Sequence, residues 1–202
     1  MGEPRRRDSA RTRKLLLETA RRRFARDGYA ATTVRDIADE AGANVALISR
    51  YFGSKEGLFE ACLAAAADSV RGTQDGDVAL EGLGRSIARG MAGVSSAHGL
   101  PEVLLLSLRP SGDEQAERAR IRTLSSYAER MAALALPEGA PLPDDLHLRG
   151  QVLLATALGV AVLRATPGLG PITSATEDQL ADALSDVVSA LLGRGPGPLT
   201  QP

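Results

Sequence analysis

The feature that most constrains the fold of this chain is the stretch at residues 32–52, TTVRDIADEAGANVALISRYF. Thr33 and Asp36 have the spacing of a capping box, which predicts the first turn of a helix. Gly42 predicts the end of that helix, because glycine readily adopts the left-handed conformation that follows a helix. Asn44 is a good cap for a further short helix. Two short helices joined by a glycine-containing turn are typical of a helix-turn-helix, whose second helix enters the DNA major groove.

Helical spacing of apolar residues also recurs in the rest of the chain, and no stretch alternates as a strand would. We therefore expect an all-α protein. A helix-turn-helix DNA-binding domain is predicted over residues 9–56, followed by a larger helical domain over residues 57–193. Residues 1–8 and 194–202 are predicted to be flexible tails.

Glycines and capping residues add detail to the larger domain. Four glycines between residues 82 and 93 interrupt a predicted helix. Because glycine weakens a helix, this pattern indicates either a helix that moves or one that packs closely against a neighbour. Ser174 and Glu177 have the spacing of a capping box and predict the start of the last helix.

Charge is distributed unevenly along the chain. Residues 1–60 carry 13 lysines and arginines against 9 acidic residues, a net charge of +4, and the remainder carries 11 against 16, a net charge of −5. This asymmetry fits a polyanion partner at one end of the molecule. It fits equally well a solvated helix face preceded by a basic tail.

Several functional classes lack the residues that they need. No apolar run approaches the roughly 20 residues of a membrane-spanning helix. The single cysteine, Cys62, allows no internal disulfide and fits a reducing, cytoplasmic setting. His98 and His147 have no metal-ligand partners at useful spacing, so we expect neither a metal nor another cofactor. The sequence contains neither a nucleophile–base set nor a glycine-rich phosphate loop, so nothing in it indicates an enzyme.

One longer pattern joins the helix-turn-helix to its neighbours. It consists of ARRRFARDGYAATTVRDIADEAG, a short helix with an apolar core, an aromatic pair and a Ser-Lys-Glu step. Over about residues 11–63 this pattern resembles the TetR (tetracycline-repressor-like) family of bacterial transcriptional regulators. The resemblance implies a homodimer that binds a palindromic double-stranded DNA operator. The rest of the chain matches the family only in its layout of helices.

The resemblance also implies a mechanism. A ligand bound in the C-terminal domain favours a dimer state whose recognition helices no longer match two major grooves. The chain would then be a repressor that a small apolar or amphipathic effector releases from its operator. The alternative is a DNA-binding regulator whose C-terminal domain binds a protein partner or no effector.

The aromatic pair predicts a contact with the DNA backbone. Ile48 and Phe52 are spaced to share the inner side of their helix, which turns Tyr51 outward, where its hydroxyl can donate to a phosphate. Lys55 places a charge at the first turn of the next helix, and Thr33 can bind a phosphate at the start of its own. Each of these residues also has a purely structural interpretation, as a cap, a packing residue or a solvated cation.

Base reading is predicted for the exposed face of the second helix of the motif. Arg50 can bind a guanine through two hydrogen bonds, and it can equally bind a phosphate. The predicted DNA contacts are Thr33, Asn44, Val45, Ala46, Ser49, Arg50, Tyr51 and Lys55.

The larger domain is predicted to bind the effector and to dimerise. The candidate pocket walls are Leu104, Leu108, Leu124, Tyr127 and Met131, although core packing would explain the same apolar residues. The resemblance places two late helices in a four-helix dimer interface, and an intramolecular core is the alternative. The predicted interface residues are Leu153, Ala157, Val160, Leu180, Leu184, Val187 and Leu191.

Overall fold

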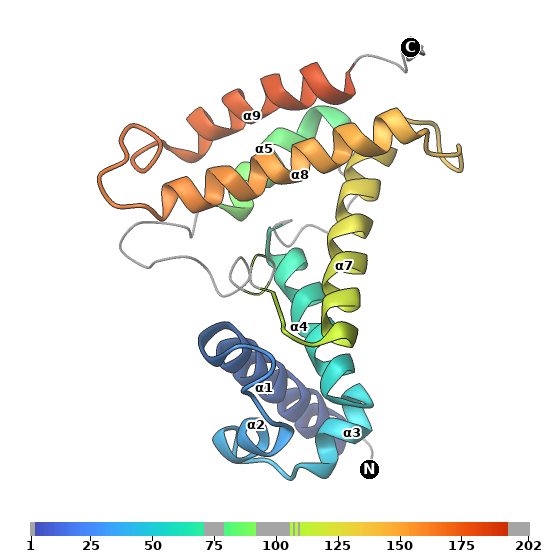
Figure 1. Cartoon of the computed structure of the whole chain (residues 1–202), viewed down its shortest axis with the longest axis vertical. Helices are drawn as coiled ribbons and strands as arrows, with labels where there is room; N and C mark the ends of the chain where they lie inside the picture. Colours follow the sequence, from blue (N-terminus) through green and yellow to red (C-terminus); the bar gives the residue numbers. More distant parts are fainter. Residues whose placement is uncertain (1–2, 71–78, 92–105, 107, 109, 194–202) are drawn as a thin grey trace. The chain divides into compact units, whose positions relative to one another are not determined.

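The computed structural model describes residues 3–70, 79–91, 106, 108 and 110–193, without the side chains of residues 3–8 and 66–70. Every regular element in these residues is a helix (Figure 1), which confirms the all-α class. The chain divides into two compact units. Unit 1 contains Met1–Ala67 and Glu102–Thr123, and unit 2 contains Asp68–Pro101 and Leu124–Pro202.

The segment predicted as an N-terminal tail is mostly helical. Helix α1 spans Glu3–Asp27 and so begins inside residues 1–8, which corrects the prediction of a flexible tail there. Pro4 lies in its first turn, where a proline ring is tolerated, and neither proline nor glycine follows before Gly28. The other predicted tail, residues 194–202, lies outside the described residues.

Unit 1 packs its helices around an aromatic cluster. Its elements are α1, α2 (Val34–Glu40), α3 (Ala46–Phe52) and parts of α4 (Lys55–Val70) and α7 (Glu114–Ala133). Phe24 of α1 is buried, and its ring centre lies 5.2 Å from that of Phe59. The ring of Tyr29 packs against the same cluster, with its centre 4.9 Å from that of Phe59. The domain boundary predicted after residue 56 falls inside α4, which continues without a break.

Residues from much later in the sequence complete the core of unit 1. Leu106 and Ala116 are buried together with side chains of α1, α3 and α4. Cys62 is also fully buried in this core, and its thiol lies 3.7 Å from the carbonyl oxygen of Leu17. This burial agrees with a thiol that contributes to packing.

Unit 2 shows why a glycine interrupts its first helix. The elements of unit 2 are a short 3-10 helix (Leu80–Gly82), α5 (Leu83–Gly90), the end of α7, α8 (Asp144–Arg164) and α9 (Glu177–Leu192). Both α5 and α8 pack against α9. A Cβ on Gly84 would overlap the backbone of Ser185 on α9, so this glycine permits a close helix–helix approach. Of the two interpretations, close packing holds for Gly84, while Gly93 lies outside the described residues.

The last helix, α9, begins later than predicted. Gln179 N donates to the hydroxyl of Thr176 (3.2 Å), and Thr176 N donates to Oε1 of Gln179 (2.9 Å), which completes a capping box. Ser174 lies in the preceding turn, where its hydroxyl donates to the carbonyl oxygen of Pro171 (3.0 Å). The sequence contains one capping pattern at Ser174 and Glu177 and another at Thr176 and Gln179, and α9 begins with the one at Thr176.

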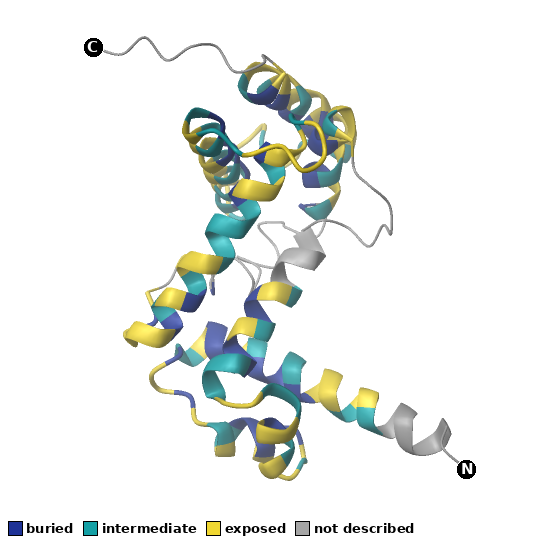
Figure 2. Ribbon diagram, turned by 90° about the vertical axis from the view of Figure 1, so that its right-hand side faces the viewer, coloured by how far each residue is buried: buried dark blue, intermediate teal, exposed yellow. Residues whose placement is uncertain are grey.

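Helix α8 has two apolar sides. One side is buried, and Gly150 on it has no room for a Cβ, because the carbonyl oxygen of Ala128 on α7 is in the way. The opposite side, which we call the outer face of α8, is exposed; it consists of Leu148, Val152, Ala155, Gly159 and Leu163. Figure 2 shows how buried and exposed positions alternate along the helices of the chain. With both sides apolar, α8 is long and apolar enough to span a bilayer by length and composition alone, which the sequence analysis did not anticipate.

Candidate functional site

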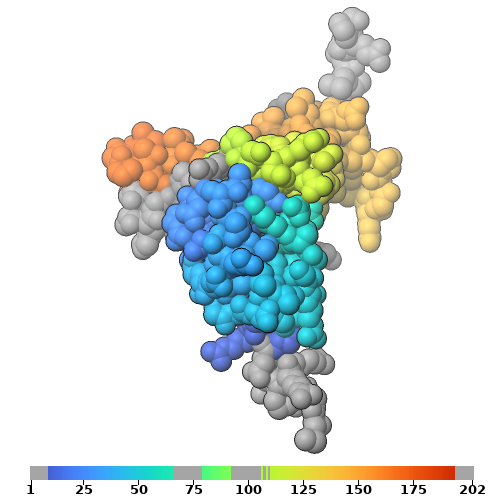
Figure 3. Space-filling model, turned by 60° about the horizontal axis from the view of Figure 1, so that its bottom comes forward, coloured from blue at the N-terminus to red at the C-terminus, as the bar shows by residue number. Residues whose placement is uncertain are grey.

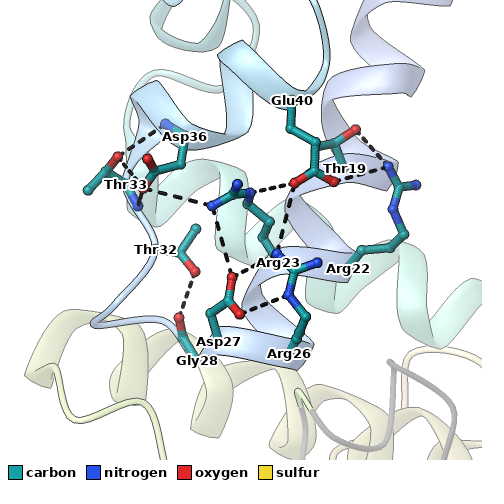
Figure 4. A network of polar contacts seen from close by, with 10 residues as sticks. All are labelled: Thr19, Arg22, Arg23, Arg26, Asp27, Gly28, Thr32, Thr33, Asp36 and Glu40. Atoms are coloured by element: carbon teal, nitrogen blue, oxygen red, sulfur yellow. Dashed lines mark hydrogen bonds and ion pairs between the residues drawn. The ribbon is translucent and has the colours of Figure 1, made fainter.

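The arginines at the end of α1 are engaged with acidic residues of α1 and α2 (Figure 4). Arg23 Nε donates to Oε2 of Glu40 at 2.6 Å, and Arg22 lies 3.6 Å from the other carboxylate oxygen. Arg26 pairs with Asp27 at 2.8 Å. The hydrogen bond from Arg23 lowers the pKa of Glu40. Much of the positive charge of α1 is therefore balanced within unit 1, where it holds α1 against α2.

Helix α2 begins with the predicted capping box. Asp36 N donates to the hydroxyl of Thr33 (3.1 Å), and Thr33 N donates to Oδ2 of Asp36 (3.1 Å). The Thr33 hydroxyl also donates to the same carboxylate at 2.6 Å, and this bond lowers the pKa of Asp36. Because its only hydroxyl proton is used internally, Thr33 serves as a cap and keeps no donor for a phosphate.

The turn between α2 and α3 also forms as predicted. Gly42 has a φ of +61°, the left-handed conformation, and Ala43 N donates back to the carbonyl oxygen of Ala38 (2.9 Å). These features close the end of α2. Asn44 then accepts a hydrogen bond from Ala46 N at 2.9 Å, so its side chain caps the start of α3.

Helix α3 presents the predicted reading face to solvent. Ile48 is only 1% exposed and anchors the opposite side in the core of unit 1. Figure 3 shows the surface that α2 and α3 form on this side of unit 1. The exposed residues are Asn44, Val45, Ala46, Ser49 and Arg50, which is the set predicted to read bases.

The aromatic pair at the end of α3 is arranged differently from the prediction. Tyr51 and Phe52 are both half-buried, so neither is simply an inner or an outer residue. The Tyr51 hydroxyl lies 3.1 Å from the hydroxyl of Ser9 on α1. The guanidinium of Arg13 lies 5.1 Å from the ring centre of Phe52, and that of Arg50 lies 5.9 Å from the ring centre of Tyr51. The start of α1 therefore belongs to the same surface as the end of α3.

Sequence reasoning missed the two α1 residues in this cluster, although helical spacing indicates them. Ser9 and Arg13 precede the buried Leu16 at i−7 and i−3, so all three share one side of α1. That side continues into the core of unit 1. What the spacing alone does not show is that α3 lies against this end of α1.

Two glycines explain the Gly-Ser-Lys-Glu-Gly sequence after the aromatic pair. Gly53 has a φ of +80°, which ends α3 sharply. Ser54 caps α4 by accepting a hydrogen bond from Gly57 N at 3.1 Å. A Cβ on Gly57 would overlap the carbonyl oxygen of Phe52, so only glycine permits this close junction. The junction fixes α4 relative to α3.

Lys55 is half-buried and does not simply extend into solvent. Its Nζ lies 4.1 Å from the ring centre of Tyr29, and burial lowers its pKa. Tyr29 in turn donates to Oε1 of Glu56 at 2.9 Å. Lys55 therefore sits at the first turn of α4, as predicted, but on an aromatic ring that restricts its movement.

The structure separates the predicted pocket residues. Leu104 lies outside the described residues, and Leu108 is exposed in unit 1. Leu124, Tyr127 and Met131 are half-buried on the part of α7 that belongs to unit 2. The guanidinium of Arg130 lies 4.8 Å from the ring centre of Tyr127. The three α7 residues therefore belong to one unit and Leu108 to the other.

The predicted dimer residues fall into two groups. Leu153, Ala157, Leu180 and Leu184 are buried inside unit 2, as in the intramolecular core that was the alternative. Leu180 and Leu184 also line an open hollow on the surface of unit 2. Val160, Val187 and Leu191 are half-buried. The outer face of α8 was not among the predicted residues.

A hollow of about 660 Å³ lies on unit 2 beside this face. It is lined by Thr156 and Val160 of α8, by the loop between α8 and α9, and by α9 side chains including Val187. By helical spacing, Thr156 and Val160 continue the row that begins at Val152. The hollow and the outer face of α8 are therefore neighbouring parts of one surface. His147 lies elsewhere on α8, 3.9 Å from Glu129, and His98 is outside the described residues.

Two family models match the sequence. The model for bacterial regulatory proteins of the tetR family matches residues 16–62. The model for the tetracyclin repressor-like C-terminal domain matches residues 81–192, more than half of the chain.

Individual relatives extend these matches. The HTH-type transcriptional dual regulator CecR of Shigella flexneri is 47% identical over 58 residues, which are 29% of this chain and 26% of CecR. The HTH-type transcriptional repressor AcnR of Corynebacterium glutamicum is 36% identical over 93 residues, which are 46% of this chain and 38% of AcnR. The chain thus spans less than half the length of the curated relatives that it matches.

Solved structures match nearly the whole fold. A TetR-family regulator from Streptomyces coelicolor A3 is 27% identical with a TM-score of 0.54, over 92% of this chain and 96% of that one. A complex of SmeT with triclosan is 22% identical with a TM-score of 0.59, over 94% of this chain and 99% of that one. At that identity the second likeness concerns the fold alone.

Proposed function

This chain belongs to the TetR family of bacterial DNA-binding transcriptional regulators, and we propose that it is a cytoplasmic repressor that a small molecule releases from its operator. It binds a two-fold symmetric operator as a homodimer. Unit 1 contacts the DNA, and unit 2 holds the second copy and the effector.

The observation that carries this proposal is the exposed face of α3. Five exposed residues there stand opposite the buried Ile48. Arg50 on this face has no carboxylate within ion-pair distance among the described residues, so its guanidinium is available to a base or a phosphate. Val45 and Ala46 allow a close approach to the groove and can contact thymine methyl groups.

The homodimer is supported by the outer face of α8. Leu148, Val152 and Leu163 are 60%, 45% and 43% exposed, which is unusual for large apolar side chains on one helix face. A two-fold axis places the same face of a second copy against it, because an isologous contact buries one patch on its own image. The small Ala155 and Gly159 between these side chains allow two helices to approach closely. The second copy would also cover the neighbouring hollow.

The proposed effector is a small molecule that binds to unit 2. A protein of this fold, SmeT, is seen in complex with triclosan, a small molecule. The half-buried Leu124, Tyr127 and Met131 on α7 are where we place the effector in unit 2. The alternative is that unit 2 responds to a protein partner or to no effector. Release of purified protein from its operator by a small molecule alone would distinguish the two.

The test is in vitro selection from a random duplex library, with the mass of the protein and of the complex measured on the enriched site. We expect a two-fold symmetric sequence bound by two chains. Enrichment of no sequence, or a single chain on an asymmetric site, would contradict the proposal. The enriched operator then serves as the probe for effector release.

A further inference from the structure

The start of α1 and the end of α3 form one cluster of side chains that the proposed contacts do not explain. Ser9 and Arg13 come from α1, and Arg50, Tyr51 and Phe52 come from α3. We define these five residues as the α1–α3 cluster. Figure 3 shows the described start of α1 at the edge of the surface formed by α2 and α3.

The two hydroxyls of the cluster share one hydrogen bond and keep one proton free. Ser9 Oγ and Tyr51 Oη are 3.1 Å apart, and either can be the donor. Each hydroxyl has a single proton to donate, and only one proton is used between them. Whichever way the bond runs, the pair retains one O–H for an acceptor in solvent. A phosphate oxygen is an acceptor of this kind.

The two arginines of the cluster are held by aromatic rings and not by carboxylates. Arg13 lies over Phe52 and Arg50 over Tyr51, and the planes of the two rings are at 84° to each other. No carboxylate of the described residues lies within ion-pair distance of either guanidinium. Stacking restricts a guanidinium through its flat face and leaves the N–H edge free to donate. Both cations are therefore oriented and still unneutralised.

Arginines farther along α1 provide the contrast. Arg22 and Arg23 point toward Glu40, as Figure 4 shows, and their charge is used inside unit 1. The same residue type on the same helix thus serves two purposes. Arg13, in contrast, has no ion pair with a carboxylate of the described residues, so its charge is available to an external anion.

We propose that Ser9 and Arg13 bind the DNA backbone together with Tyr51 and Arg50, so that the start of α1 is part of the DNA-binding surface. This inference rests on the proposed function, and it adds two contact residues from outside the helix-turn-helix. The acceptor is a backbone phosphate, because two guanidinium edges and a hydroxyl proton fit an anion with several oxygen atoms. Such contacts add affinity without reading sequence.

The test measures how binding to the selected operator depends on salt, for the full chain and for matched variants. Arg13→Gln is expected to weaken binding about tenfold and to reduce the slope of log K against log salt by about one. Arg22→Gln is the control, because it removes the same charge from the same helix at a position already paired with Glu40. It should leave the slope unchanged. Arg13→Lys keeps a cation and should retain the slope.

The hydroxyl pair is tested by a double-mutant cycle. Either single variant keeps one hydroxyl proton for a phosphate, so Ser9→Ala and Tyr51→Phe should each weaken binding less than about twofold, whereas the double variant, which keeps none, should weaken it about threefold or more. Thermal unfolding of every variant reports any loss of structure. If the wild-type chain binds no duplex, the proposed function fails. If it binds and Arg13→Gln behaves like Arg22→Gln, only the inference about α1 is wrong.

Discussion

Helices α3 and α8 each leave one face uncovered by their own unit, and the two faces differ in chemistry. The face of α3 is polar or small and carries an unneutralised guanidinium. The outer face of α8 is apolar along its whole length, with no charged residue among Leu148, Val152, Ala155, Gly159 and Leu163. Both helices bury their opposite sides, through Ile48 in unit 1 and through Leu153 in unit 2.

The comparison shows how an uncovered face indicates its partner. Cations that are held in place and left unpaired favour an anion, since nothing in their own unit neutralises them. Large apolar side chains that stay exposed favour an apolar partner, and a second copy supplies one of matching shape through symmetry. The face of α3 therefore predicts an anionic partner and the outer face of α8 predicts an apolar one, and the two predictions can be tested separately.

The largest effect is expected from a charge on the outer face of α8. The pair of substitutions Val152→Asp and Leu163→Asp should convert the proposed dimer to a monomer, because it would bury four unpaired carboxylates in the apolar contact between the two copies. Operator affinity should then fall by about 100-fold or more, since two linked half-sites bind far more tightly than one. Light scattering and operator binding measure the two effects.

The control for this change is Ile121→Asp on α7. Ile121 is 52% exposed in unit 1, so this substitution adds one carboxylate at a similarly exposed apolar position. We expect it to leave the mass and the affinity unchanged. If the double α8 variant remained dimeric, a second copy of the chain would not be the partner of the outer face of α8.

Glycines on the two sides of α8 should respond in opposite ways. Gly150→Ala should lower the free energy of unfolding by about 2 kcal/mol, because its Cβ would overlap the backbone of α7. Gly159→Ala has open space around the new Cβ and should raise the stability of the monomeric fold by about 0.5–1 kcal/mol. Urea unfolding measures both. A destabilising Gly159→Ala in a monomeric background would contradict the assignment of its face as uncovered.

The substitution Arg50→Ala tests the exposed face of α3. Affinity for the selected operator should fall about tenfold. Binding to a panel of operators with single base changes shows the cause. Relaxed specificity at one base pair would mean that Arg50 reads a base, whereas a uniform loss would mean that it binds a phosphate. An unchanged affinity would remove α3 from the DNA-binding surface.

The smallest expected effect is a dependence of unit 1 stability on acid. Hydrogen bonds from Ser54 and Tyr29 lower the pKa of Glu56 from its ordinary 4.5. Its folded pKa lies below the unfolded one, so the stabilisation is present above about pH 4.5 and is lost as the pH falls through the folded value. Unfolding of Glu56→Gln and wild type should therefore differ less at about pH 3 than at about pH 6. A constant difference would show that the ionised carboxylate contributes nothing.

Local patterns predicted the helix-turn-helix well, and contacts between distant residues were not predicted. The caps at Thr33 and Asn44 depend on neighbours two or three residues away, which a sequence shows directly. The contact of Ser9 with Tyr51 joins residues 42 positions apart, and that of Arg23 with Glu40 joins residues 17 apart. Such pairs depend on how helices cross, which local periodicity does not determine.

The exposed side of α8 was not predicted, for a related reason. A helix with one apolar stripe reveals its buried face through its spacing. On α8 both sides are apolar, so Val152 and the neighbouring Leu153 look equally suited to the core. Only the packing of Gly150 against α7 decides which side turns inward.

Unit 1 is discontinuous in sequence, and this affects how its relatives can exchange parts. The chain leaves unit 1 after Ala67 and returns at Glu102, and the returning segment contributes Leu106 and Ala116 to the core. The family model for the C-terminal domain, residues 81–192, includes that segment. A chimera that joins the first 67 residues to another regulator's sensing half would therefore inherit a foreign core. A graft that retains Glu102–Thr123 with the DNA-binding helices would keep the native one.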